Sequence, residues 1–385
     1  MGHTVAIIGA NDFQNQAILL AKSLGYTTHV FAWADGAVGK DTANHFYPVS
    51  ITEKERILEI CRPLRLDGVF SIGSDLAVPT VSYLAARLGL PGNSEACAAV
   101  STNKFRMRRR FRERGIPTPR FWEVASPAES DAVDAPFPLI VKPTDRSGSR
   151  GVTRVEDRAT LREAVARCVG CSFEKKAIVE EYIEGDEYSA ESISFRGRHR
   201  LLAVTQKFTT GAPHFIETGH VQPAPVPPGA VRDAVFAALD ALEITCGASH
   251  AEFKVTSAGE VRLIEVGARM GGDCIGSDLV RLSTGHDFLR MTLDAACGKA
   301  PDFTPVSVPQ TAFVRFLFGQ ADLDTLHVMQ EEAPDVLRRV SAIEPPAGRP
   351  VTDSSNRLGY YLGACADERF VRLRSLLGFA QAVPQ

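Results

Sequence analysis

Residues 249–273, SHAEFKVTSAGEVRLIEVGARMGGD, decide the fold and function predicted for this chain. Polar and apolar residues alternate over 250–255 and again over 261–265, which is typical of two strands. Ala258-Gly259 between them is a turn signal, so the stretch predicts a hairpin. A turn centred there sets Glu252 directly opposite Glu265, and like charges in that arrangement repel each other. Either a cation between the carboxylates or solvation at a sheet edge would relieve the repulsion.

The length and composition of the chain are typical of a globular protein with two or three domains. It has 385 residues, of which 44% are hydrophobic and 23% are charged. The formal net charge of −3, from 43 basic and 46 acidic residues, provides no overall basic field for nucleic acid or an anionic membrane. No basic leader or apolar run of membrane-spanning length stands out, so we expect neither a signal peptide nor a membrane partner.

The eight cysteines do not form a metal-binding pattern. Only Cys168 and Cys171 are spaced like metal ligands, and no second pair completes a zinc site. We therefore interpret this pair as incidental thiols near a helix end. A reduced, cytoplasmic protein is expected.

The N-terminal part of the chain alternates strand and helix patterns, which predicts a parallel α/β fold. A strand over 4–9, a helix over 16–24 and a strand over 27–33 begin the series. The turn Gly9-Ala10-Asn11-Asp12 has one glycine where a dinucleotide fingerprint has three, so an oxidoreductase is disfavoured. A helix over 53–62, a strand over 68–72 and a further apolar helix continue the pattern.

A basic segment, residues 101–115, separates this region from the next. Interleaved Phe105, Met107 and Phe111 indicate an amphipathic helix with a solvated basic side, which we favour over a nucleic-acid patch. Gly115-Ile116-Pro117-Thr118-Pro119 then breaks the chain. We expect an N-terminal domain over residues 1–100.

Two segments beyond this break suggest nucleotide binding, although each has a plainer interpretation. A strand ending at Lys142 leads into the loop 145–152, whose small residues and flanking cations suit a phosphate flap or simply a turn. The second segment, 177–189, is an apolar strand that ends in a run of carboxylates. It suggests a hinge whose backbone pairs with a purine edge, or else a solvated acidic turn.

Taken in order, these motifs resemble the ATP-grasp superfamily of carboxylate–amine ligases, over residues 104–273. The superfamily combines a lysine before the central domain, a Lys-Pro strand with a Gly/Ser-rich flap, an acidic hinge and two metal-binding glutamates. The resemblance implies an ATP-grasp architecture: a Rossmann-like N-terminal domain over 1–100, an ATP-grasp domain over 101–300 with a flap subdomain over about 117–185, and a β-rich extension over 301–385.

The resemblance also assigns site residues. It implies that Glu252 and Glu265 hold Mg²⁺, or Mn²⁺ in its place. Many members carry an asparagine two residues after the second glutamate, where this chain has Gly267, so water or substrate would fill that ligand position. The implied ATP-binding residues are Lys104, Lys142, Ser147, Gly148, Ser149, Gly151, Glu180, Glu181, Ile183 and Glu187.

Residues 265–273, EVGARMGGD, look like the branch that contains the dipeptide-forming L-amino-acid ligases. In that branch the arginine four residues past the metal glutamate contacts the transferring group, and Arg269 holds that position. Glu217 and His220 resemble the pair that binds the amino-acid substrate, although a polar loop over the sheet would also explain them. The substrate-binding prediction further includes Gly271 and Gly272.

The resemblance implies an ADP-forming ligase that makes an amide through an acyl phosphate, with ATP and Mg²⁺. Its partners would be small molecules, an amino acid or other carboxylate and an amine, and related ligases suggest a homodimer. One alternative is an ATP-grasp enzyme that activates bicarbonate or a purine-pathway carboxylate. A non-catalytic nucleotide-binding module is the other.

Overall fold

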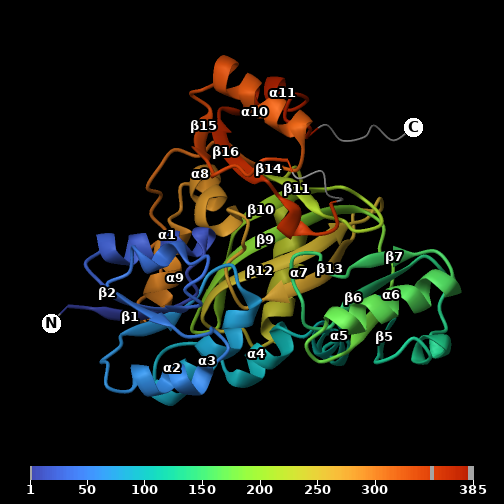
Figure 1. The fold of residues 1–385 in the computed structure, drawn as a ribbon, viewed down its shortest axis with the longest axis horizontal. Helices are drawn as coiled ribbons and strands as arrows, with labels where there is room; N and C mark the ends of the chain where they lie inside the picture. The colour runs from blue at the N-terminus through green and yellow to red at the C-terminus, as the bar shows by residue number, and fades with distance from the viewer. Residues whose placement is uncertain (1, 347–350, 380–385) are drawn as a thin grey trace.

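The computed structural model describes residues 2–346 and 351–379, and within them the strands form three β-sheets with helices packed against them (Figure 1). The N-terminal sheet lies on one side of the molecule and the small central sheet on the other. The large sheet runs between and above them. The chain is therefore α/β, as the sequence predicts.

The N-terminal sheet is parallel in the strand order β3-β2-β1-β4. Helix α1 begins after Asn11, whose side chain accepts a hydrogen bond from the Gln14 backbone, and α3 ends at Gly89, whose φ of +67° suits glycine. The loops that follow β1 and β4 lie at the carboxyl edge of this sheet, where α/β proteins commonly bind ligands. The strands are β1 (Thr4–Ile8), β2 (Thr27–Ala32), β3 (His45–Pro48) and β4 (Gly68–Phe70), and the helices are α1 (Asp12–Ser23), α2 (Lys54–Cys61), α3 (Val78–Leu88) and α4 (Glu95–Ser101).

The small central sheet is antiparallel in the order β5-β8-β6-β7. Helix α6 (Arg158–Cys171) covers one face of it with buried Leu161 and Val165. Cys168 is also buried there as a free thiol, consistent with a packing residue. The strands are β5 (Phe121–Val124), β6 (Leu139–Pro143), β7 (Thr153–Val155) and β8 (Ala177–Glu181).

The basic segment forms helix α5 (Lys104–Glu113), with Met107 and Phe111 buried as predicted. One arginine departs from the prediction of a solvated basic side: Arg108 is 2% exposed and reaches the carboxylate of Glu180 on β8. Burial of the apolar face turns this arginine toward the small sheet, so α5 contributes a charge to the interior.

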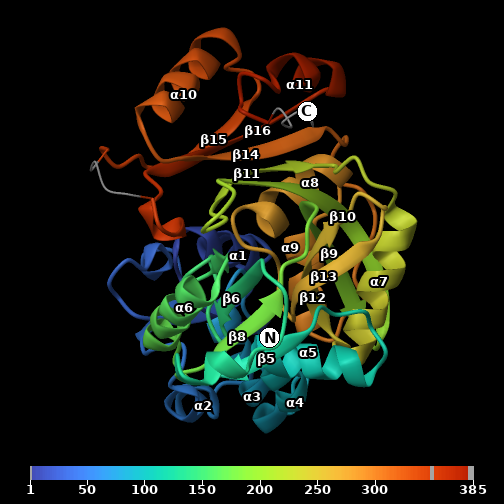
Figure 2. The same cartoon turned by 90° about the vertical axis from the view of Figure 1, so that its right-hand side faces the viewer.

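The large sheet is antiparallel, in the order β13-β12-β9-β10-β11-β14-β16-β15. Helix α7 (Pro228–Ala241) packs on one of its faces, and α9 (Phe288–Ala296) lies between the sheet and the N-terminal domain (Figures 1 and 2). The strands are β9 (Asp186–Phe195), β10 (Arg198–Thr209), β11 (Glu217–Gln222), β12 (Gly247–Val255), β13 (Val261–Gly267), β14 (Thr311–Leu317), β15 (Leu337–Val340) and β16 (Gly359–Cys365).

The C-terminal part of the chain continues this sheet. Strands β14, β16 and β15 extend it beyond β11, and helices α10 (Gln320–Glu332) and α11 (Asp367–Leu373) cover them (Figure 2). Phe313, Tyr361 and Phe379 form the apolar layer between these helices and the strands. The predicted domain limits at residues 100 and 300 stay predictions. None of the described helices is both long and apolar enough to cross a membrane.

Candidate active site

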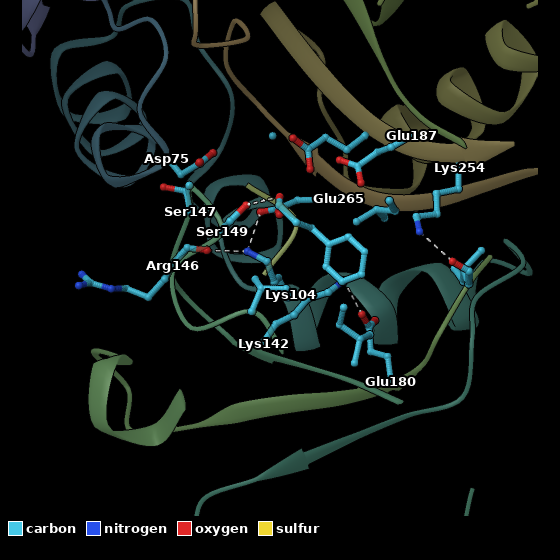
Figure 3. Close-up of a pocket in the computed structure, with 18 of the residues that line it drawn as sticks. Asp75, Lys104, Lys142, Arg146, Ser147, Ser149, Glu180, Glu187, Lys254 and Glu265 are labelled. Atoms are coloured by element: carbon cyan, nitrogen blue, oxygen red, sulfur yellow. Dashed lines mark hydrogen bonds and ion pairs between the residues drawn. The ribbon is translucent and has the colours of Figure 1, made fainter. Parts of the chain in front are cut away.

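A cavity of about 140 Å³ lies between the small central sheet and the large sheet (Figure 3). The hinge after β8, the loop before β7, the β12–β13 hairpin and the loop after β4 all contribute side chains to its wall. Eleven residues predicted from the sequence line it: Lys104, Lys142, Ser147, Gly148, Ser149, Glu180, Glu181, Ile183, Glu187, Glu217 and Arg269. The two predicted metal ligands, Glu252 and Glu265, line it as well.

Glu252 and Glu265 are direct partners across the hairpin, as the sequence predicts. The turn, however, is centred on Ala258 and not between Ala258 and Gly259, so the pairing next to it is shifted by one residue: Val255 pairs with Val261 and Phe253 with Leu263. A β-bulge at residue 264 then shifts the register by one and restores the pairing of the two glutamates. The bulge also lets Ile264 and Glu265, neighbours in the chain, both line the cavity.

Each of these glutamates is held by a lysine. Nζ of Lys207 lies 2.7 Å from Glu252 Oε1, and Nζ of Lys104 lies 3.0 Å from Glu265 Oε1. Lys207 also lies 3.0 Å from Glu187 Oε1 and 3.6 Å from Glu217 Oε1. Burial alone would lower the pKa of Lys207, but the surrounding carboxylates raise it well above its usual range. Lys207 therefore stays charged at the centre of an acidic cluster.

Lys142 and Glu180 form a second buried group. Nζ of Lys142 lies 2.8 Å from Glu180 Oε2, and Arg108 contacts the other carboxylate oxygen. Burial would raise the pKa of Glu180, but these two cations outweigh it and lower the pKa to about 2. Glu180 is therefore an anion that holds Lys142 in place, and both residues line the cavity (Figure 3).

Aromatic rings and a lysine form the hinge end of the cavity. Tyr182 and Phe215 stack with their ring centroids 5.9 Å apart. Nζ of Lys254 lies 4.5 Å from the Tyr182 ring centroid and donates to the Ile183 carbonyl at 3.0 Å. Glu181 bonds to Arg120 at the rim. This end offers apolar faces and backbone groups of the kind that bind a planar base.

The loop predicted as a phosphate flap, residues 145–152, is closed over the cavity. Ser149 Oγ donates to the Phe215 carbonyl at 3.1 Å, and Ser354 Oγ donates to the Gly148 carbonyl at 3.2 Å. Gly148 and Gly151 have φ of +70° and +72°, a backbone conformation that favours glycine. Gly151 does not line the cavity; its carbonyl faces helix α6, where Cys168 Sγ contacts it.

Glu217 and His220 lie together with two residues that the sequence did not single out. His220 Nε2 lies 3.9 Å from Asp273 Oδ2, and Arg357 Nη2 lies 2.9 Å from Asp273 and 3.6 Å from Glu217. Among the described residues, neither ring nitrogen of His220 nor Oε2 of Glu217 has a hydrogen-bond partner. Buried polar atoms without partners are rare in proteins, so these atoms indicate a place for a polar ligand.

Arg269 pairs with Asp75, which comes from the loop after β4. Arg269 Nε and Nη2 donate to the two carboxylate oxygens of Asp75, each at 2.8 Å. Gly271 N donates to Glu191 Oε2 at 2.9 Å, and Gly272 packs against Gly73. Neither glycine lines the cavity; both belong to the loop that carries Arg269.

The donor set of the hairpin fits a hard divalent cation. Glu252 and Glu265 supply carboxylate oxygens, the ligands that Mg²⁺ prefers, and lysine ammonium groups now neutralise both of them. Within residues 2–346 and 351–379, no group of three or more His, Cys, Asp or Glu side chains could hold a metal ion. A cation here would therefore rely on the two glutamates together with water or substrate oxygens.

Five residues of the site were not singled out from the sequence: Asp75, Lys207, Lys254, Asp273 and Arg357. Asp75 follows a parallel strand, at the edge where α/β proteins bind ligands, and that position was a usable signal. Lys207 and Lys254 are charged residues inside otherwise alternating strands, which is a weaker signal. Nothing in the local sequence connects Arg357 with Asp273, because 84 residues separate them.

Comparisons with known proteins agree with this geometry. Residues 135–278 match the ATP-grasp domain family. Carnosine synthase 1 from Mus musculus is 28% identical over 335 residues, which is 78% of this chain. Alanine–anticapsin ligase from Bacillus subtilis is 27% identical over 276 residues, which is 64% of this chain. The crystal structure of an L-amino acid ligase from Bacillus licheniformis superposes with a TM-score of 0.80 and 25% identity, covering 97% of this chain and 96% of that chain.

The chain spans only part of the curated relatives: the matches cover 40% of the mouse protein and 58% of the Bacillus subtilis protein.

Proposed function

The chain carries an ATP-grasp domain, and from this premise we propose that it is an ATP-dependent carboxylate–amine ligase that joins an amino acid to an amine. The observation that supports this most is the wall of the cavity. It brings together the paired carboxylates, Lys104 and Lys142, the loop predicted as a flap, and Arg269. The names of the relatives, a carnosine synthase, an alanine–anticapsin ligase and an L-amino acid ligase, support the same substrate class.

In this proposal ATP binds along the cavity from hinge to hairpin. The base lies at the hinge end beside Tyr182 and Ile183, and Glu187 binds the ribose hydroxyls. Lys104, Lys142 and the flap hold the phosphates, and Glu252 and Glu265 hold Mg²⁺. When bound, Mg²⁺ supplies charge neutralisation at the phosphate oxygens during transfer.

The chemistry needs a shared intermediate, because a carboxylate is a poor electrophile. The substrate carboxylate attacks the γ-phosphorus of ATP, giving an acyl phosphate and ADP. The amine then attacks the acyl carbon, Arg269 stabilises the oxyanion, and phosphate leaves as the amide forms. The closed flap keeps water from the acyl phosphate. Glu217 and His220 bind the amino-acid substrate, which would accept and donate the hydrogen bonds that Glu217 Oε2 and the His220 ring nitrogens do not make within the described residues.

We further infer that the enzyme acts in the cytoplasm on small molecules and forms a homodimer. Size-exclusion chromatography with light scattering tests the dimer, and an eluted mass near 41.7 kDa would exclude it.

The central test is ADP release measured over a matrix of amino-acid pairs, with bicarbonate as a separate arm. We expect ADP only when both a carboxylate and an amine substrate are present. Glu265→Gln should reduce turnover at least ~10²-fold while the variant still unfolds in one cooperative thermal transition. Glu260→Gln, an exposed glutamate on the same hairpin, is the matched control and should keep full turnover. ADP release with bicarbonate but no amino-acid pair, or normal turnover of Glu265→Gln, would contradict the proposal.

A further inference from the structure

The N-terminal domain reaches into the cavity through one side chain, Asp75 on the loop that follows β4 (Figure 3). We propose that Asp75 is a positioning residue for Arg269, and that Gly267 leaves the space that this contact requires. The inference rests on the proposed function, because it concerns the orientation of the arginine to which that function assigns oxyanion stabilisation.

The pairing of Asp75 with Arg269 fixes the guanidinium plane. Both bonds are 2.8 Å, and the two side chains are only 16% and 14% exposed. Two parallel N–H···O bonds between charged groups combine strength with a defined orientation. Among the described residues, Arg269 donates once more, from Nη1 to the Met270 carbonyl at 3.1 Å. An arginine has five N–H donors, so two remain for a ligand.

Gly267 stands where the sequence resemblance leads us to expect an asparagine that binds the metal. A Cβ atom at Gly267 would lie 3.2 Å from Asp75 Oδ1 and 3.4 Å from Arg269 Nε. A side chain at this position would therefore press on the Asp75 carboxylate and would lie in contact with Arg269. The φ of Gly267 is not positive, so the backbone conformation does not require glycine here, and the missing side chain is explained by the space that Asp75 and Arg269 occupy.

A second contact holds the same two loops together. Gly73 N donates to the Met270 carbonyl at 3.2 Å, and a Cβ atom at Gly73 would lie 3.4 Å from Gly272 Cα. The loop 73–75 of the N-terminal domain thus lies directly against the loop 267–273.

Asp75 is not a substitute for the missing metal ligand. Both of its carboxylate oxygens accept from the Arg269 guanidinium, and that positive charge would repel a metal cation bound to Asp75.

The test compares Asp75→Asn, Asp75→Glu and Gly267→Asn with the wild type, for turnover, KM of each substrate, Mn²⁺ affinity and thermal unfolding. Asp75→Asn should lower kcat by ~10²-fold while the KM for ATP changes by less than about threefold, because orientation and not nucleotide binding is lost. Asp75→Glu, which keeps the carboxylate, should recover part of that loss. Gly267→Asn should also lower kcat and should leave Mn²⁺ affinity unchanged.

Asp335→Asn is the matched control. Asp335 makes a bidentate pair with Arg369 on the exposed C-terminal surface, and its removal should leave all these quantities unchanged.

Turnover of Asp75→Asn within about twofold of the wild type would overturn the inference. Tighter Mn²⁺ binding and faster turnover in Gly267→Asn would also overturn it, since Gly267 would then be a lost ligand. If Asp75→Asn does not fold, the kcat and Mn²⁺ affinity of Gly267→Asn test the inference by themselves. A wild type without ADP release refutes the proposed function itself, which separates the two failures.

Discussion

Buried charges lie in and behind the wall of this cavity, and several of them form compensated groups. Lys207 contacts Glu187, Glu217 and Glu252, while Glu180 is held by Arg108 and Lys142. Removing one member of such a group leaves an uncompensated charge, which costs more than the pair itself stabilises. These ion pairs hold the side chains in place before any ligand arrives, which is the pre-organisation that the proposed phosphate site would require.

Glu180 tests the claim that removing one member of a buried charge group is costly. Glu180→Gln should lower the free energy of unfolding at pH 7 by about 3 kcal/mol, because Arg108 and Lys142 lose their anion. The pKa of Glu180, lowered to about 2 from its usual 4.5, lies below the value in the unfolded chain. Its contribution is therefore complete above pH 4.5 and is lost as the pH falls toward 2.

Urea denaturation of the wild type and the variant at several pH values measures this difference. The difference in unfolding free energy should be constant above about pH 5.5 and should shrink below about pH 4.5. Glu260→Gln, which removes an exposed partner of Arg262, should change stability by less than about 1 kcal/mol. A Glu180→Gln difference that does not vary with pH down to the acid transition would contradict the assignment.

At the scale of elements, the cavity depends on two interruptions of regular strand structure: the bulge at Ile264 and the loop 145–152. The bulge at Ile264 turns Ile264 and Glu265 toward the same cavity, whereas strict alternation would send one of them away. The flap is a short glycine-containing loop that rests on Phe215 and on Ser354, far along the chain. The closed position of the flap therefore depends on a few hydrogen bonds, and a substitution that removes one of them should shift the flap toward an open position.

Ser354→Ala should weaken flap closure without touching the nucleotide site. Losing its hydrogen bond to the Gly148 carbonyl costs about 1 kcal/mol, which is roughly a fivefold change in the ratio of closed to open flap. Water would then reach the acyl phosphate more often, so the ratio of phosphate released to amide formed should rise. Ser126→Ala, at an exposed turn, is the control. An unchanged ratio would show that this contact does not govern closure.

At the scale of the whole molecule, one continuous sheet joins the hairpin to the C-terminal strands. The order β13-β12-β9-β10-β11-β14-β16-β15 places the predicted metal ligands at one edge and the last strands of the chain at the other. Helix α9 and its neighbours join this sheet to the N-terminal one in a shared apolar core. The N-terminal domain is thereby fixed close enough for Asp75 to reach Arg269.

A chain shortened to residues 1–300 should not fold into a stable enzyme. It would lose β14, leaving the edge of β11 unpaired, and would expose an apolar surface normally covered by Phe313 and Phe316. Soluble yield and a cooperative thermal transition measure the outcome, with the full chain as reference. A soluble product with a cooperative transition near that of the full chain would show that residues 301–385 are a separate unit.

Much of this architecture follows from sequence alone, because local patterns encode it. The alternation over 250–265 predicts the hairpin, and the N-terminal helix and strand periods predict a parallel sheet. The pairing of Glu252 with Glu265 is predicted as well, but in the structure it depends on the bulge at residue 264, which no local pattern indicates. The ATP-grasp prediction is confirmed by the match of residues 135–278 to the ATP-grasp domain family and by the superposition on an L-amino acid ligase. The roles of the individual site residues stay predictions.

The sequence by itself determined the fold class, the hairpin and the chemical groups available to the site, because strand alternation, glycine turns and motif spacing are local properties of the chain. Only the tertiary structure decided which charges meet. It brought Asp75 to Arg269 across 194 positions and set both beside Gly267. Such pairings depend on how separate sheets and loops pack, and the burial of charge then selects the partners.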